Sequence, residues 1–121
     1  MNYTDFNAFC ESLTATTHVV QWGDADVWKV GGKVFAIGGW SQSDQPAITF
    51  KVSDSNYHFL SAEPGYRPAP YFATRGMKWI QQHGVPVPPD ADLHYYLTES
   101  HRLVAAKLTR KLRRELGLDE A

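Results

Sequence analysis

The residues of this chain that could do chemistry are mainly its cations, and these are unevenly spread. Residues 1–66 hold three basic and seven acidic side chains, whereas residues 67–121 hold nine basic and six acidic ones. The stretch 100–114 alone contains six basic side chains and no acidic one. Such an asymmetry can steer a polyanion to one end of a nearly neutral domain. A solvated last helix is the alternative explanation, because cations are favoured near a helix C-terminus.

A second group of cations falls on predicted strands. Lys29, Lys51 and Lys78 alternate with large apolar side chains, so we expect them on the sheet face opposite the core. Lysines on an open face could contact phosphates, with Trp40 or Tyr71 nearby to stack on bases. The alternative is that these lysines only keep an uncovered face soluble and discourage edge pairing.

The C-terminal helix supplies the other candidate residues. Lys107, Arg110 and Arg114 are spaced i, i+3 and i+7, so a continuous helix would place them on one flank, with Arg102 elsewhere on the cylinder. This flank could lie along a phosphate backbone, bind an acidic partner or remain solvated. Phosphate contacts position a ligand without reading its sequence, so no sequence specificity is predicted.

Other reactive residue types form no recognisable catalytic or metal-binding pattern. The single cysteine, Cys10, lies beside Phe9 on an amphipathic segment, which favours a buried and inert thiol. His94 and His101 are two helical turns apart, too far to share a metal. The Gly31-Gly32-Lys33 turn leads into a strand and lacks the Walker pattern. We therefore expect no catalytic residue, no metal and no cofactor.

The elements that must position these cations begin with a predicted hairpin. Gly31-Gly32 joins two β-rich runs, and such turns need positive φ at their central positions. This turn places Trp28 opposite Phe35, on one face with Val30 and Ile37. We expect this heavier face to pack into the core.

The rest of the sequence predicts further helices and strands. Helices are expected over about residues 4–14 and 53–62 and from Asp90 onward, where the last can break near Ser100. Extended segments are expected over about residues 19–22, 47–52, 67–71 and 77–80. The order predicts an α+β fold with two layers, in which an antiparallel sheet of about five strands carries helices on one face, in the order α-β3-α-β2-α.

Length and composition bound the class of protein. A chain of 121 residues predicts one domain over 1–121, with a basic C-terminal helical extension at about 107–116. A hydrophobic content of 43% excludes a disordered tail. The sequence has no apolar run near the ~20 residues that span a bilayer and no signal-peptide core at its start. We expect a soluble, cytoplasmic protein with no membrane partner.

Six sequence blocks resemble a known family. They are Trp22-Gly23, Val30-Gly31-Gly32-Lys33-Val34-Phe35-Ala36, Phe50-Lys51-Val52-Ser53, Pro64-Gly65-Tyr66-Arg67-Pro68-Ala69-Pro70-Tyr71, Lys78-Trp79-Ile80 and Ser100-His101-Arg102-Leu103-Val104. In this order they resemble the MmcQ/YjbR family of small bacterial proteins, over about residues 5–106. The resemblance implies an α+β domain similar in fold to type III secretion chaperones, and DNA binding through a "double wing" motif. The chain departs from the family at His101-Arg102, where tyrosine and a variable residue are frequent, and in its basic residues after Leu108.

These observations favour a non-enzymatic protein that binds DNA weakly and without sequence specificity. The candidate DNA-binding residues are Lys29, Lys51, Lys78, Arg102, Lys107, Arg110 and Arg114. The net charge of −1 counts against this function, since nucleic-acid-binding domains often have a pI above ~9.

Two alternatives remain open. One is a protein–protein interaction module, or a homodimeric chaperone-like protein, that binds no nucleic acid. The other is an enzyme or small-ligand binder built around Trp22, Tyr71 and Trp79, which requires a pocket of roughly 300–1,000 Å³ with convergent polar groups.

Overall fold

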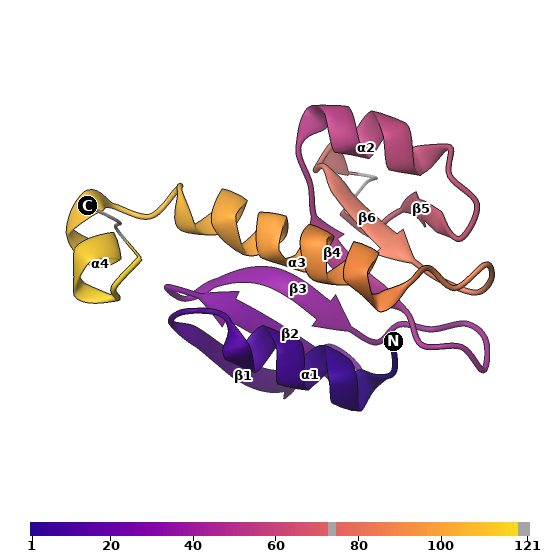
Figure 1. Cartoon of the computed structure of the whole chain (residues 1–121), viewed down its shortest axis with the longest axis horizontal. Helices are drawn as coiled ribbons and strands as arrows, with labels where there is room; N and C mark the ends of the chain where they lie inside the picture. Colours follow the sequence, from indigo (N-terminus) through magenta and orange to yellow (C-terminus); the bar gives the residue numbers. More distant parts are fainter. Residues whose placement is uncertain (73–74, 119–121) are drawn as a thin grey trace.

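The computed structural model describes residues 1–72 and 75–118. Its elements are α1 (Tyr3–Ser12), β1 (Thr16–Gln21), β2 (Ala25–Val30), β3 (Lys33–Gly38), β4 (Ile48–Lys51), α2 (Asp54–Ser61), β5 (Tyr66–Pro68), β6 (Trp79–Gln82), α3 (Asp90–Ala105) and α4 (Arg110–Glu115) (Figure 1). Within these residues, none of the helices is both long and apolar enough to cross a membrane.

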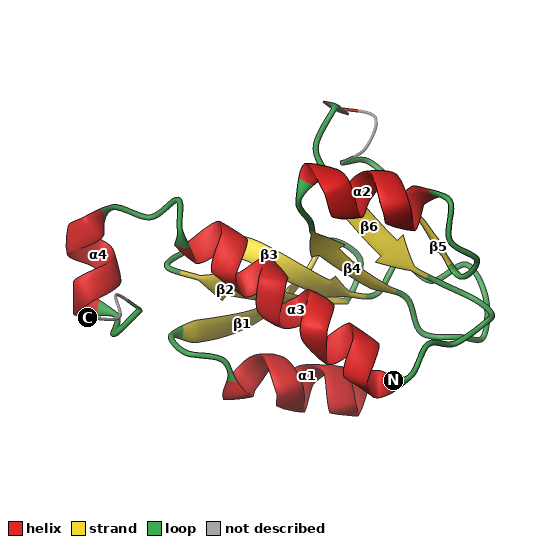
Figure 2. Ribbon diagram, turned by 45° about the horizontal axis from the view of Figure 1, so that its top comes forward, coloured by secondary structure: helices red, strands yellow, loops and turns green. Residues whose placement is uncertain are grey.

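The predicted α+β class is confirmed. The strands form an antiparallel sheet in the order β1-β2-β3-β4-β6-β5, and α1, α2 and α3 cover one of its faces (Figure 2). In the described part of the chain this sheet has six strands instead of about five, and four of them precede α2. The short β5 contains Pro68 and lies at a sheet edge, where the missing N–H of a proline is tolerated.

The main core lies between the sheet and the helices. Phe6 of α1 and Leu97 of α3 are fully buried with Phe50 of β4 and Ile80 of β6. Cys10 belongs to the same core, and burial raises the pKa of its thiol far above the ordinary value. The thiol is therefore protonated and shielded, as expected from the sequence.

The hairpin turn is confirmed, but its register differs from the prediction. Gly31 and Gly32 have φ of 58° and 81°. Trp28 pairs with Ala36, not with Phe35, because a bulge follows Trp28 and makes Phe35 an extra residue of β3. The extra residue shifts the alternation, so that Ile37 faces away from the helices.

The face predicted for Lys78 is also wrong. Phe50 pairs with Ile80, and both face the helix-side core. Lys78 therefore lies on the helix side as well, where its ammonium group is 4.7 Å from the ring centroid of Tyr57 in α2. Trp79 is 4% exposed and lies on the other face. The prediction that Lys78 shares a face with Lys29 and Lys51 is contradicted.

The C-terminal helix breaks later than expected. Ser100 lies inside α3, where its hydroxyl donates to the Phe35 carbonyl (2.5 Å) and accepts from the Lys51 backbone N–H (2.9 Å). The helix ends at Ala105, and α4 begins after Thr109, whose side chain accepts from the N–H of Leu112. The side chain of Leu108, in the connection, is buried.

Candidate functional site

The sheet face opposite the helices is partly covered, not open as the sequence suggested. Val27, Ile37, Thr49 and Gln81 are neighbours in register across β2, β3, β4 and β6, and all four are buried. A small cluster formed by Ala25, Val27 and Ile37 has Val34, Trp40 and Phe72 packed against it. We call the sheet face opposite the helices the second face. Aromatic side chains of the connecting loops cover part of it.

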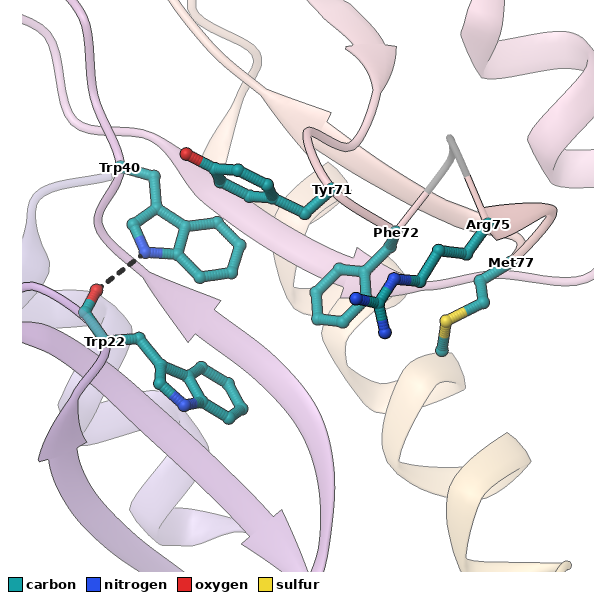
Figure 3. Close-up of a pocket in the computed structure, with 6 residues that line it drawn as sticks. All are labelled: Trp22, Trp40, Tyr71, Phe72, Arg75 and Met77. Carbon is teal, nitrogen blue, oxygen red and sulfur yellow. Dashed lines mark hydrogen bonds between the residues drawn. The ribbon is translucent and has the colours of Figure 1, made fainter.

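A hollow of about 660 Å³ opens on the second face, and we call it the aromatic hollow. It is lined by Trp22, Trp40, Tyr71, Phe72, Arg75 and Met77 (Figure 3). These side chains come from three separate segments, namely the β1–β2 turn, the β3–β4 loop and the chain between β5 and β6. In Figure 3 the four rings surround a common space, and the side chain of Arg75 points towards it.

Hydrogen bonding and backbone geometry hold these rings in place. The indole N–H of Trp40 donates to the Trp22 carbonyl at 2.9 Å, and the Trp40 ring centroid lies 5.6 Å from that of Tyr71. Trp22, Trp40 and Tyr71 have φ of 55°, 63° and 70°, a region that bulky L-residues rarely adopt. Strain of this kind, about 1–3 kcal/mol per residue, is concentrated at functional sites in proteins.

A second hollow, of about 390 Å³, adjoins the first and carries the charge. Lys33, Lys51 and Lys107 line it, and we call these three residues the lysine cluster. Among the described residues that line this hollow, none is acidic. Burial lowers the pKa of Lys51, and the charges of Lys107 and Lys33 lower it further. Three ammonium groups thus converge on a place that holds no counter-charge from the described chain.

The two hollows form one groove. Both are lined by Trp22, Phe72 and Met77, so the aromatic hollow adjoins the second hollow, which the lysine cluster lines. The floor beneath the cluster includes Trp79, onto whose ring Phe72 stacks at 4.7 Å. The indole N–H of Trp79 is buried without a hydrogen-bond partner among residues 1–72 and 75–118.

The structure brings together only part of the predicted site. Lys51 and Lys107 meet in the lysine cluster. Lys29 also lies on the second face, because its neighbours Trp28 and Val30 face the helix-side core and its register partner Val34 lines the second hollow.

The basic residues of the last helices do not join one flank. Because α3 ends at Ala105, Lys107 lies in the connection, whereas Arg110 and Arg114 belong to α4 (Figure 1). The predicted shared flank is therefore wrong. Arg102 donates two hydrogen bonds to Glu99, at 2.9 and 3.0 Å, which lower the pKa of that carboxyl group.

Sequence reasoning missed several residues of the groove. In the sequence Lys33 belongs to a predicted turn, and Arg75 lies in no predicted element. Trp22, which the sequence indicates only for a small-ligand site, is 49% exposed in the groove. A signal is present between the extended segments expected at 67–71 and 77–80, where the aromatic Phe72 and the basic Arg75 lie in a connection without a helical or strand pattern.

Comparisons with known proteins agree with the fold. A family model described as YjbR matches residues 11–103. A Deinococcus radiodurans protein with a DUF419 domain has a similar crystal structure, with 24% identity, a TM-score of 0.83, and 99% of this chain and 91% of that chain covered. For a Pseudomonas syringae protein from structural genomics the identity is 20% and the TM-score 0.67, with 86% of this chain and 99% of that chain covered. No curated protein matches the chain. Because the family model spans well over half of the sequence, as the resemblance of the six blocks predicted, the chain belongs to the YjbR family.

Proposed function

We propose that this protein binds nucleic acid in the groove of the second face, weakly and without sequence preference, and that it is not an enzyme. The observation that carries the proposal is the convergence of Lys33, Lys51 and Lys107 beside exposed aromatic rings. The resemblance to the YjbR family implies the same class of ligand.

Electrostatics favours a polyanion at this place. The charged groups that lower the pKa of Lys51 are both lysines, so the free protein keeps like charges together. A phosphate between them replaces repulsion by charge-assisted hydrogen bonds. Lysine acts on phosphate as a point charge and reads no base, so the contacts are independent of sequence. With few phosphate contacts and a net charge of −1, weak binding is expected.

The test is a titration of fluorescein-labelled DNA of mixed sequence, followed by anisotropy at about 50 mM salt. Replacing Lys33→Gln or Lys107→Gln removes one exposed charge of the lysine cluster. We expect each variant to bind about 3- to 10-fold more weakly, which corresponds to about 1 kcal/mol per lysine.

Lys78→Gln is the matched control, because it removes the same charge from the helix side of the sheet. It should leave the affinity within about twofold of the unmodified protein, well below the effect of one direct charge contact. Absence of an anisotropy change at about 100 μM protein, the weak limit of non-specific binding, would refute the proposed function. An equal loss in all three variants would show that only the total charge matters.

A second candidate function is self-association through the sheet edge. Within the described part of the chain β1 pairs only with β2, and its residues Val19 and Val20 are 36% and 55% exposed. An exposed edge strand with apolar side chains and no lysine is a template for pairing with another chain. This observation supports the alternative of a homodimeric protein.

A further inference from the structure

The aromatic hollow has more exposed ring surface than phosphate binding requires. Trp22 is 49% exposed and Tyr71 is 70% exposed, and Trp40 and Phe72 lie between them and the sheet. Single exposed aromatic residues are ordinary on protein surfaces. Here, however, rings from three segments converge on one hollow (Figure 3), and three of them have positive φ. The arrangement therefore offers stacking surfaces to a ligand that has flat apolar faces.

The same ligand must also carry negative charge. The hollow continues into the lysine cluster through the shared wall of Trp22, Phe72 and Met77. Among the described residues that line the aromatic hollow, Arg75 is the cation, and it is exposed. A ligand that fills both hollows would place a flat ring among the aromatic side chains and a negative charge beside the lysines. A nucleotide unit has both parts, because a sugar joins its base to its phosphate.

Resting on the proposed function, we propose that the ligand is single-stranded nucleic acid, with an unpaired base stacked among Trp22, Trp40 and Tyr71 and an adjacent phosphate in the lysine cluster. In a duplex, the faces of the bases are covered by their neighbours, so protein rings cannot reach them. In a single strand every base has a free face, and stacking on aromatic side chains is tolerant of sequence.

Trp79 forms part of the wall of the same hollow. Its side chain lines the second hollow and is 4% exposed, yet its indole N–H has no partner among the described residues. A buried donor without an acceptor is unfavourable and rare in native structures.

The experiment compares a fluorescein-labelled oligothymidylate of about 12 nucleotides, within the usual site size for single-strand binding folds, with a labelled duplex of equal length. The single strand should bind at least about tenfold more tightly. Tyr71→Ala and Trp22→Ala should each weaken single-strand binding about 5- to 100-fold, the range measured for loss of one stacking ring. Neither variant should change binding of the duplex by more than about twofold, because its base faces are covered.

Tyr95→Ala is the matched control, because Tyr95 is a 56% exposed tyrosine of α3, on the helix side of the sheet. Its affinity for the oligothymidylate should be unchanged. Trp22→Phe keeps a ring at the same position and should retain most of the binding, which separates the loss of stacking from a folding defect. Circular dichroism of each variant should match that of the unmodified protein.

The outcomes separate the two proposals. If duplex and single strand bind equally and the ring variants have no effect, this inference is overturned while nucleic-acid binding by the lysine cluster stands. If Tyr95→Ala is as harmful as Tyr71→Ala, stacking in the aromatic hollow is overturned. If neither DNA binds, the proposed function itself fails.

Discussion

At the level of single residues, Lys51 connects the fold to the proposed ligand. Its backbone N–H donates to the hydroxyl of Ser100 at 2.9 Å, so α3 fixes the position of this residue at the end of β4. Its side chain enters the lysine cluster, where Lys33 and Lys107 repel its charge. The backbone of Lys51 is thus hydrogen-bonded to α3, while its side chain lines the groove.

The lowered pKa of Lys51 predicts a pH dependence of DNA binding. Burial lowers this pKa below its ordinary value of 10.5, and the charges of Lys107 and Lys33 lower it further. A bound phosphate favours the charged amine, so the pKa is higher in the complex and a proton is taken up when the pH lies between the two values. Affinity should therefore be fully present below the pKa of the free protein and should fall as the pH rises through this window.

Anisotropy titrations of oligothymidylate between about pH 7 and 10, below the ordinary lysine range, measure this dependence. Lys51→Arg keeps its charge over the whole range and should flatten the profile. Lys29→Arg is the control at a lysine of the second face that does not line the hollow, and its profile should follow that of the unmodified protein. A profile equally steep in Lys51→Arg would assign the titration to another group.

At the level of elements, the connection between α3 and α4 determines where Lys107 lies. Leu108 in this connection packs onto the β2–β3 turn, where a Cβ on Gly31 would be 2.4 Å from its nearest side-chain carbon. The hairpin turn carries Lys33 immediately after Gly32. Contact between turn and connection therefore brings two members of the lysine cluster together.

Gly31→Ala should disrupt this contact. The added methyl group meets Leu108 and the residue is held at φ 58°, so both crowding and backbone strain oppose it. We expect a loss of about 2–4 kcal/mol in the free energy of unfolding, measured by urea denaturation, together with weaker DNA binding.

Gly32→Ala provides the comparison, because its φ is 81° but a Cβ there meets no atom within 4 Å. In this variant only the backbone strain should lower the free energy of unfolding, by about 1–2 kcal/mol, and DNA binding should be preserved. Equal losses of stability and affinity in the two variants would argue against a role for the Leu108 contact.

The sequence predicted the helices and the hairpin from periodicity and turn chemistry, but not which side chains face the core. The bulge at Phe35 leaves no trace in composition, since Phe35 and Ala36 are both apolar and both buried. In β6, Trp79 and Ile80 are both buried because the second face is also covered. Assigning the heavier face to the core fails where both faces are buried. The meeting of Lys51 with Lys107 depends on tertiary packing, which local patterns do not encode.

At the level of the whole molecule, the two sides of the sheet are covered in different ways. The helices cover one side of the sheet (Figure 2). The groove lies on the other side and extends to the end of α3, where Val104 and Lys107 line it. The net charge of −1 therefore conceals a local concentration of positive charge. Total charge is a poor guide to ligand class when the cations are gathered on one face.

The free edge of β1 allows a test of the alternative function. If the protein is a homodimer joined at this edge, light scattering after size exclusion should give twice the chain mass of 13.6 kDa. Val20→Lys should then return the protein to the monomer, because a charge at an edge strand opposes pairing. Val87→Lys, at a 48% exposed valine in the loop before α3, should not. A monomeric mass at all concentrations would rule out the hypothesis of a dimer joined at the edge of β1.

The small cluster of Ala25, Val27 and Ile37 beneath the rings has a consequence for how the family can diversify. It closes the far side of the sheet with aliphatic side chains that lie apart from the packing around Phe6 and Leu97. Exposed loop rings such as Trp22 and Tyr71 can therefore be exchanged with little damage to the helix-side interior. Substitutions at these rings can change the surface of the groove while the packing around Phe6 and Leu97 stays the same.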